Sequence, residues 1–454
     1  MHEEKFEHEP RGEFRGDFSR DTFDPFRHFS RVLMQQGRVH IDADWNEQVS
    51  IFSYYLRRLG TDLMGPHGAP CTEEGEDGEG YMIRPSKGAT FNISSGNYYV
   101  KGILCENNET ITYHNQPYFQ KEGNIKDGSY LVYLDVWERH LSFVEDNYMR
   151  EAALGGPDTA SRAKIVWQVK LKELTKKVKI TKGSKYNEWN KVLVKEKKPG
   201  TGLLRARARK DENDNGPCLT SPESRYRGAE NQLYRVEIHK GGMVKDNVTF
   251  KWSRNNAADI YSIKKVDGTI ITLEHLGRDN RSSLKPNDWV ELVDDDYILQ
   301  NRSDSLLQVF KVDHENMQVT LKESPKSDVG QDKNKHKHPY LRRWDHTART
   351  GNLSEGAIIV TEGSSEDWLH LEDGVQIQFD FAKTRMYHTG DYWLIPARTA
   401  TGDVEWPGSV ETPIFLAPHG VVHHYAPLQL ITVTDGKLTI KDENDLRRKL
   451  KKMW

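Results

Sequence analysis

Short runs of β-branched and aromatic residues, separated by turn residues, recur along most of the chain and restrict its fold more than any other sequence feature. Examples are NYYVKGILCE, SYLVYLDVWE, KIVWQVKLKEL, GVQIQFDF and LQLITVTDGKLTI. Residues of these types favour a pleated, half-buried backbone, so each run predicts one or two β-strands. The chain also contains 11 Trp, 19 Tyr and 15 Phe, enough aromatic side chains for several small cores. We therefore expect a mainly β, multidomain protein.

One segment breaks this pattern and predicts an N-terminal α-helix. Trp45 begins a series of apolar residues at successive spacings of 4, 3, 4, 3 and 4, which places all of them on one helix face. The series continues with Val49, Phe52, Leu56, Leu59 and Leu63. We expect the helix to cover residues 45–64, with Gly65 as its C-cap and Pro66 as its stop.

The apolar face of this helix has two interpretations. Because it spans fewer than three heptads, packing against the protein's own core is favoured over a coiled coil. In the alternative, the face is a contact surface for a partner. Its candidate interface residues are then Val49, Phe52, Leu56, Leu59 and Leu63.

Four oxygen-bearing side chains lie at the start of the helix: Asp42, Asp44, Asn46 and Glu47. Three of them fit the first positions of an EF-hand loop, but Glu47 stands where that loop needs glycine, and Ser53 stands where it needs a bidentate carboxylate. A capping box fits better: Asp44 would accept hydrogen bonds from the first turn while Glu47 reaches back. We therefore predict a helix cap here and no metal site.

Composition shifts and turn clusters predict the domain boundaries. Two similar segments, Val266–Asp267 to Thr272–Leu273 and Val312–Asp313 to Thr320–Leu321, indicate an internal duplication within a small β-barrel. The predicted units are a flexible arm at 1–16, a docking segment at 17–70 that contains the helix, a β-rich domain at 80–244 with a basic insertion at 172–210, the β-barrel at 245–325, a C-terminal β domain at 340–435, and a basic tail at 436–454 with a short helix candidate.

The sequence contains no phosphate-binding loop, dinucleotide-binding turn, serine elbow or zinc-ligand spacing, so we predict no catalytic residues, no cofactor and no metal. Paired carboxylates of a glycoside hydrolase stay open, because such residues can be distant in sequence. The net charge of −3 and the glutamates within the basic insertion disfavour nucleic acid as a partner. Trp393 and Trp406 are candidate sugar platforms, although Trp393 lies in an apolar run and burial is expected for it.

The sequence also carries expectations about location. No apolar run comes near the length of about 20 residues that a membrane span needs. The first residues also lack the apolar stretch of a secretion signal. The three cysteines, Cys71, Cys105 and Cys218, are odd in number and far apart, which suits free thiols in a reducing compartment. We expect a cytoplasmic protein without a membrane span.

The segment GDFSRDTFDPFRHFSRVLMQQGRVHIDADWNEQ resembles the N-terminal signature of an uncharacterised bacterial family that is associated with phage-tail-like contractile injection systems. Further matching segments are LVYLDVWERHLSFVED, ALGGPDTASRAKIVWQVKL, YRGAENQLYRVEIHKGG, TFKWSRNNA, GDYWLIPARTATGDVEWPG and PHGVVHHYAPLQL. The resemblance extends from about Gly16 to Ile431. The lysine-rich stretch near 172–200 and the C-terminal tail depart from it.

This resemblance implies a non-enzymatic structural component of a tail-like particle, placed at its baseplate, spike or fibre. It implies other particle subunits as partners, a homo-oligomer or ring within the assembly, and assembly in the cytoplasm. The helix 45–64 and the segment 16–40 would be the contact elements. The alternatives are a module that binds carbohydrate or a cell-surface glycan, and a glycan hydrolase.

Overall fold

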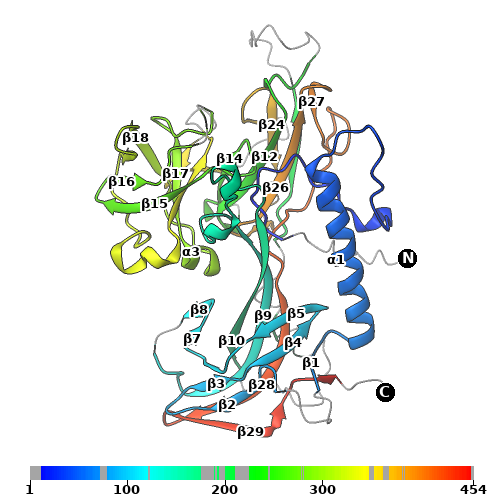
Figure 1. Cartoon of the computed structure of the whole chain (residues 1–454), viewed down its shortest axis with the longest axis vertical. Helices are drawn as coiled ribbons and strands as arrows, with labels where there is room; N and C mark the ends of the chain where they lie inside the picture. Colours follow the sequence, from blue (N-terminus) through cyan, green and yellow to red (C-terminus); the bar gives the residue numbers. More distant parts are fainter. Residues whose placement is uncertain are drawn as a thin grey trace.

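The protein is mainly β with one long N-terminal helix, as predicted (Figure 1). The computed structural model describes residues 12–71, 79–120, 123–174, 189, 192–193, 200–209, 224–243, 246–277, 279, 281–346, 352–360, 368–380, 382 and 384–450. Most of the basic insertion predicted at 172–210 lies outside these residues. The strands form a lower module, an upper module and a closed barrel, and the helix α1 lies along one side of the molecule (Figure 1).

The lower module is built on a long antiparallel ribbon. In spatial order its main sheet contains β10 (Arg162–Glu173), β9 (Gly128–Leu141), β28 (His424–Thr434) and β29 (Lys437–Asp445). A second sheet contains β30 (Lys449–Leu450), β1 (His67–Pro70), β4 (Gly96–Val100) and β5 (Ile103–Asn107). Smaller pieces are β2 (Ile83–Pro85), β3 (Phe91–Ile93), β6 (Ile111–Thr112), β7 (Asn115–Gln116) and β8 (Phe119–Gln120). Side chains from these sheets share one core, which includes Tyr98, Leu134 and Leu428.

The upper module packs a six-stranded sheet against a three-stranded one. The larger sheet contains β21 (Leu353–Ser354), β22 (Ala357–Ile359), β14 (Thr249–Ser253), β12 (Gln232–Lys240), β26 (Tyr392–Arg398) and β27 (Asp403–Val404). The smaller contains β11 (Leu204–Ala208), β24 (Val375–Phe379) and β23 (Leu369–His370), and β13 (Gly242–Met243) pairs with β25 (Met386–Tyr387). Both sheets contribute to one aromatic core around Trp252, Phe379 and Trp393, so the expected burial of Trp393 is confirmed.

The barrel contains the predicted internal duplication. Its strands, in closed order, are β15 (Ile260–Asp267), β16 (Ile270–Leu273), β19 (Gln318–Leu321), β18 (Leu307–Asp313), β17 (Trp289–Val293) and β20 (Tyr340–Trp344). The hairpins β15–β16 and β18–β19 each have a register shift at the equivalent place, and β16 pairs with β19. The predicted range of 245–325 is corrected to 260–344, because β14 pairs within the upper module and β20 closes the barrel between β15 and β17.

Long-range pairing divides the chain differently from the predicted domains 80–244 and 340–435. Strands of the second range pair with strands of the first: β28 with β9, β24 with β11, and β26 with β12. The predicted tail 436–454 also differs, because its residues up to 450 form β29 and β30 and contain no helix. The first residues of β29, KLTIK, alternate polar and apolar side chains, and the strand pairs with β28 along one edge of the lower module.

The helix α1 (Asp42–Met64) begins three residues before the predicted start and ends where predicted. Gly65 is its C-cap, with φ of 84°, and its N–H donates to the Thr61 carbonyl at 2.8 Å. The helix rests on the turn between β4 and β5, where a Cβ on Gly102 would lie 2.3 Å from the Arg57 carbonyl oxygen. Arg57 also pairs with Glu138 of β9 at 2.8 Å. Further helical pieces include α3 (Asp295–Leu299) and short 3-10 turns at Pro25–Arg27, Asn147–Met149, Ala152–Leu154 and Asp332–Lys337.

Candidate protein-interaction surface

The apolar face of α1 points away from the rest of the protein. We call it the α1 seam; it consists of Trp45, Val49, Phe52, Leu56, Leu59 and Leu63. Trp45 is 74% exposed, Val49, with the lowest value, is 50% exposed, and only Ala43 and Ile51 of α1 are buried. The expectation that the seam packs in the protein's own core is therefore wrong. The helix rests on the opposite face, so the seam is left to solvent.

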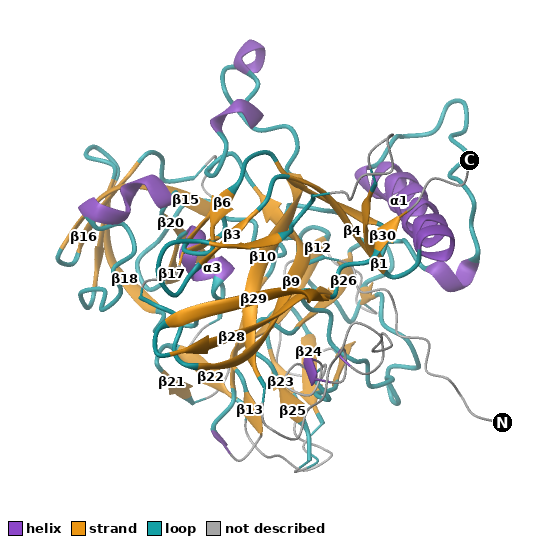
Figure 2. Cartoon of the chain, turned by 90° about the horizontal axis from the view of Figure 1, so that it is seen from below, coloured by secondary structure: helices purple, strands orange, loops and turns teal. Residues whose placement is uncertain are grey.

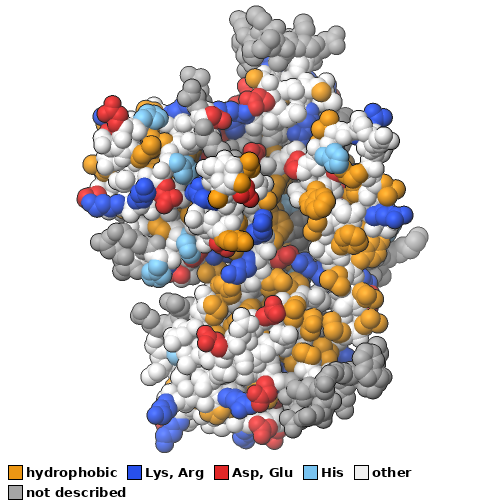
Figure 3. Space-filling view, in the orientation of Figure 1, with side chains coloured by type: hydrophobic (Ala, Val, Ile, Leu, Met, Phe, Trp, Pro, Cys, Tyr) orange, Lys and Arg blue, Asp and Glu red, His pale blue; other side chains and the backbone are white. Residues whose placement is uncertain are grey.

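The loop that precedes the helix extends this apolar surface. It exposes Phe26, Phe29, Leu33, Met34, Val39 and Ile41. Among the described residues, 13 of the 21 large apolar side chains that are exposed lie between residues 26 and 63. Figure 3 shows hydrophobic side chains gathered over α1 on one side of the molecule. Soluble monomers rarely expose contiguous apolar patches of more than a few hundred Å² unless the patch binds something.

The predicted helix cap of Asp44 and Glu47 is not found. Ile41 occupies the N-cap position and makes no side-chain cap, while Asp44 lies within the first turn. The acids at this end bind the preceding segment instead: Asp42 Oδ2 accepts from the Ser19 N–H at 2.9 Å, and Glu47 accepts from the Thr22 hydroxyl. The acids therefore tie α1 to the chain that leads into it. Nowhere among the described residues do three or more metal-ligating side chains lie close enough together to hold a metal ion.

That leading chain is held firmly to the upper module. We call residues 12–20 the strap. The Tyr392 hydroxyl donates to the Gly12 carbonyl at 3.1 Å, and Arg398 Nη2 donates to the Ser19 carbonyl at 2.8 Å. Asn256 Nδ2 donates to the carbonyls of Phe14 and Gly16 at 3.1 and 2.9 Å. Residues 12–16, which were predicted to belong to a flexible arm, are therefore fixed, and residues 1–11 lie outside the described part.

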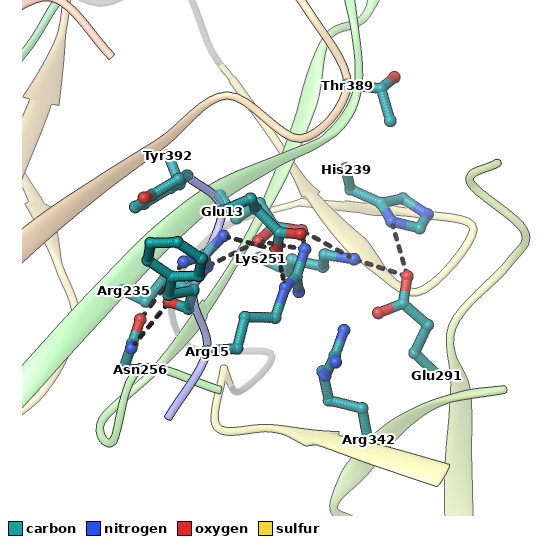
Figure 4. A network of polar contacts seen from close by, with 12 residues as sticks. Glu13, Arg15, Arg235, His239, Lys251, Asn256, Glu291, Arg342, Thr389 and Tyr392 are labelled. Carbon is teal, nitrogen blue, oxygen red and sulfur yellow. Dashed lines mark hydrogen bonds and ion pairs between the residues drawn. The ribbon is translucent and has the colours of Figure 1, made fainter. Parts of the chain in front are cut away.

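A buried charge cluster anchors the strap and joins it to two other parts of the protein (Figure 4). Its members are Glu13 and Arg15 of the strap, Arg235 and Glu237 of β12, Lys251 of β14 and Glu291 of β17 in the barrel. Within the cluster, Lys251 Nζ lies 2.6 Å from Glu291 Oε1, and Arg235 Nε lies 2.7 Å from Glu237 Oε2. Buried ions persist only where such pairing offsets their lost hydration.

Charge pairing outweighs burial for the acids of this cluster. Burial alone would raise the pKa of the Glu291 carboxyl, but the Lys251 ammonium and the other positive groups around it, such as Arg342, together more than offset burial and lower that pKa to about 2. The same balance, with Arg15 as the leading cation, lowers the pKa of Glu237. Both carboxylates therefore stay charged, and the cluster connects the upper module, the barrel and the strap. Through the strap it also determines where α1 lies.

Sequence reasoning missed this cluster, although a signal was present. In the run YRVEIHK of β12, charged or titratable residues alternate with apolar ones, at Arg235, Glu237 and His239. Alternation normally indicates one solvated face of a strand. Here both faces are buried, because the strap and the barrel cover the polar face, where Glu13, Arg15 and Glu291 lie against it. The covering elements come from distant parts of the chain, so local patterning could not indicate them.

Several buried histidines stay neutral in the folded protein. Burial lowers the pKa of His239, beside the charge cluster, to about 4. Burial likewise lowers the pKa values of four others, His67, His346 and His424 to about 4 and His140 to about 3. Several carboxyls behave in the opposite sense: burial raises the pKa of Glu372 and of Asp391 to about 7, and it also raises the pKa values of Asp259, Asp288 and Asp294.

We expect the free energy of unfolding to fall as the pH is lowered from about 6.5 to about 4. In this window the unfolded chain protonates its histidines while the folded chain keeps these five rings neutral, so protons stabilise the unfolded state. The carboxyls with raised pKa values oppose this trend, but the five histidines outnumber Glu372 and Asp391, the two whose pKa values reach about 7. Urea denaturation midpoints measured across the window test this expectation. A midpoint that stays constant or rises toward acid would contradict it.

Replacing Asn256 with glycine is expected to loosen the strap. The change removes both hydrogen bonds to the strap carbonyls and still permits the positive φ of 54° at this position. Each bond contributes about 0.5–1.5 kcal/mol, so trypsin should cleave the strap at Arg15 and Arg20 roughly ten times faster than in the wild type. Asn316→Gly, which removes an exposed asparagine on the barrel, is the matched control and should leave the rate unchanged.

One hollow lies beside the strap, and Trp406, the second sugar-platform candidate, packs on the upper module. A cavity of about 450 Å³ lies where the strap meets the start of α1, and it is lined by Asp17, Arg20 and Asp42 together with residues of β12 and Arg398. Arg398 pairs there with Glu405 at 3.1 Å. Trp406 is half-buried against the upper core, and its indole N–H donates to the Ile414 carbonyl at 2.9 Å.

No helix among the described residues is long and apolar enough to cross a membrane.

Comparison with known proteins assigns the chain to a family but not to an activity. No curated protein matches the sequence. No solved structure matches it either. A family of unknown function (DUF6519) matches residues 14–185 and 187–437, which include most of the strap, α1, most of both modules and the whole barrel. The chain therefore belongs to this family of unknown function, DUF6519.

Proposed function

We propose that the protein is a non-enzymatic assembly subunit of a phage-tail-like contractile injection system, associated with its baseplate, spike or fibre. The observation that carries this proposal is the exposed apolar surface of residues 26–63, which lies on the segment that bears the N-terminal signature. A surface of this kind suits a subunit that buries it against neighbours. The resemblance described above supplies the kind of assembly.

The way in which the surface is held supports an assembly role. The strap and the charge cluster fix α1 against a β-rich body, so the apolar face is presented on a rigid support. A rigid, pre-positioned contact element loses little conformational entropy when it binds. Within the particle, the loop 26–41 and the α1 seam would be the contact elements, and other particle subunits would be the partners.

Co-sedimentation tests the proposed function. The tagged protein is expressed in its native host, the cells are lysed gently, and particles that contain sheath and tube are pelleted. We expect the protein to pellet with the particles and to leave the pellet when the particles are dissociated. If intact particles pellet and the protein stays in the supernatant, the proposal is overturned.

A further inference from the structure

The spacing of the α1 seam is that of a coiled-coil surface. The intervals of 4, 3, 4, 3 and 4 residues place Trp45, Phe52 and Leu59 at one heptad position and Val49, Leu56 and Leu63 at the other. In the sequence alone, this spacing is compatible with core packing. In the structure the seam is exposed along the full length of the helix, so the surface lacks the facing helix that such spacing fits.

We propose that the partner of the α1 seam is the α1 seam of a second copy of this chain, packed antiparallel about a two-fold axis. This inference rests on the proposed function and names one partner of its contact surface. A two-fold interface requires a surface that is complementary to itself. The α1 seam meets this requirement in three ways.

The first is its order of residues. The series of intervals is the same when read backwards, so an antiparallel copy brings residue 45 opposite 63, residue 49 opposite 59, and residue 52 opposite 56. Each layer then contains one residue from each heptad position. The two aromatic residues, Trp45 and Phe52, both face leucines, so large side chains meet smaller ones and the layers can interdigitate. A parallel pair would instead oppose Trp45 to Trp45 and Phe52 to Phe52.

The second is charge. The first turns of α1 carry Asp42, Asp44 and Glu47, and Arg57 and Arg58 lie in its C-terminal half. An antiparallel copy therefore brings the acidic end of each helix near the basic end of the other, and it aligns the two helix dipoles favourably. The positions beside the seam carry a single charge, Asp62, which already pairs with Arg58 at 3.2 Å. Heteromeric coiled coils commonly select their partners with charges at these flanking positions.

The third is area. At roughly 100 Å² for each half-exposed large side chain, the α1 seam and the neighbouring Tyr55 present on the order of 700 Å². A stable interface of standard size buries about 800 Å² on each partner. The apolar residues of the preceding loop lie beside the helix and can add to this area, because the Val32 N–H donates to Gln48 Oε1 of α1 at 2.8 Å.

Sedimentation velocity of the purified full-length chain tests the association. We expect a concentration-dependent dimer, and Phe52→Asp should raise its dissociation constant at least about 30-fold, as for a hot-spot residue. Phe310→Asp is the matched control, because Phe310 on the barrel has the same exposed fraction of 63% as Phe52. It should leave the dimer unchanged. A wild-type chain that stays monomeric, or a dimer that survives Phe52→Asp, overturns the inference.

Cysteine cross-linking tests the orientation. Val49→Cys and Leu59→Cys are prepared as separate proteins in a background with Cys71→Ser and Cys218→Ser, then mixed and oxidised. The antiparallel arrangement predicts a disulfide between the two different variants and none within either alone, because like positions lie about 15 Å apart along the helix. A disulfide dimer of Val49→Cys alone would indicate a parallel pair and overturn the arrangement. A monomeric chain that still pellets with particles overturns this inference and leaves the proposed function intact.

Discussion

Replacing Lys251 with methionine is expected to lower the free energy of unfolding by about 3–5 kcal/mol, the range observed when one partner of a buried ion pair is removed. The Lys251 ammonium lies 2.6 Å from one oxygen of Glu291 and 3.4 Å from Glu237, and all three side chains are nearly inaccessible. Without it, Glu291 keeps its bonds from the Tyr297 hydroxyl at 2.7 Å and the Trp344 indole at 2.9 Å but has lost its closest cation. Urea denaturation followed by tryptophan fluorescence measures the loss.

Lys265→Met provides the matched control for this experiment. Lys265 pairs with Asp267 at a similar distance, 2.7 Å, but both side chains are more than half exposed. Water solvates an exposed carboxylate that loses its partner, so the denaturation midpoint of this variant should stay close to that of the wild type. Equal destabilisation by the two substitutions would show that burial of the charge cluster does not determine its contribution.

Replacing both Leu56 and Leu59 with aspartate is expected to abolish incorporation into the particle and leave the protein folded. Both side chains are more than half exposed, so the substitutions remove no core contact, and the denaturation midpoint should remain near that of the wild type. In an assembled interface the same two carboxylates would be buried without counter-ions, which is strongly unfavourable. The amount of the variant that pellets with particles, compared with the wild type in the same host, measures the effect.

Leu154→Asp serves as the control for surface charge. The side chain of Leu154 is 65% exposed, a value between those of Leu56 and Leu59, but it lies outside the α1 seam. This variant should pellet as the wild type does. If the double variant folds and is incorporated normally, α1 is not part of the contact surface. If that variant instead unfolds, the two leucines contribute to the core despite their exposure.

The α1 seam shows how far local sequence patterns reach in this protein. The intervals between Trp45 and Leu63 predict a helix with one apolar face, and Gly65 predicts its end; the structure confirms both. A repeating interval specifies which residues share a face, but it contains no information about what covers that face. Core packing and partner binding produce the same pattern, and the structure excludes packing in the chain's own core by exposing the seam.

The cap prediction was wrong for a related reason. A capping box and a pair of tertiary hydrogen bonds both place acids at the start of a helix. Asp42 and Glu47 bind Ser19 and Thr22, residues more than 20 positions earlier in the chain. Those partners become neighbours only because the strap is held against the upper module, where Asn256 binds its carbonyls. A motif of four residues cannot indicate such an arrangement.

The sequence by itself determined the elements whose signals are local: the many short strands, the extent of α1, and the duplicated hairpins of the barrel. Their side-chain periodicities, and the hydrogen bonds of α1 and of the barrel hairpins, involve residues close together in the chain. Only the tertiary structure decided which strands pair, as β9 does with β28, and which charges meet, as Arg15, Glu237 and Lys251 do. It also decided that the α1 seam faces solvent. These outcomes depend on contacts between segments hundreds of residues apart, and the free energy of such contacts comes from mutual burial that no single segment specifies.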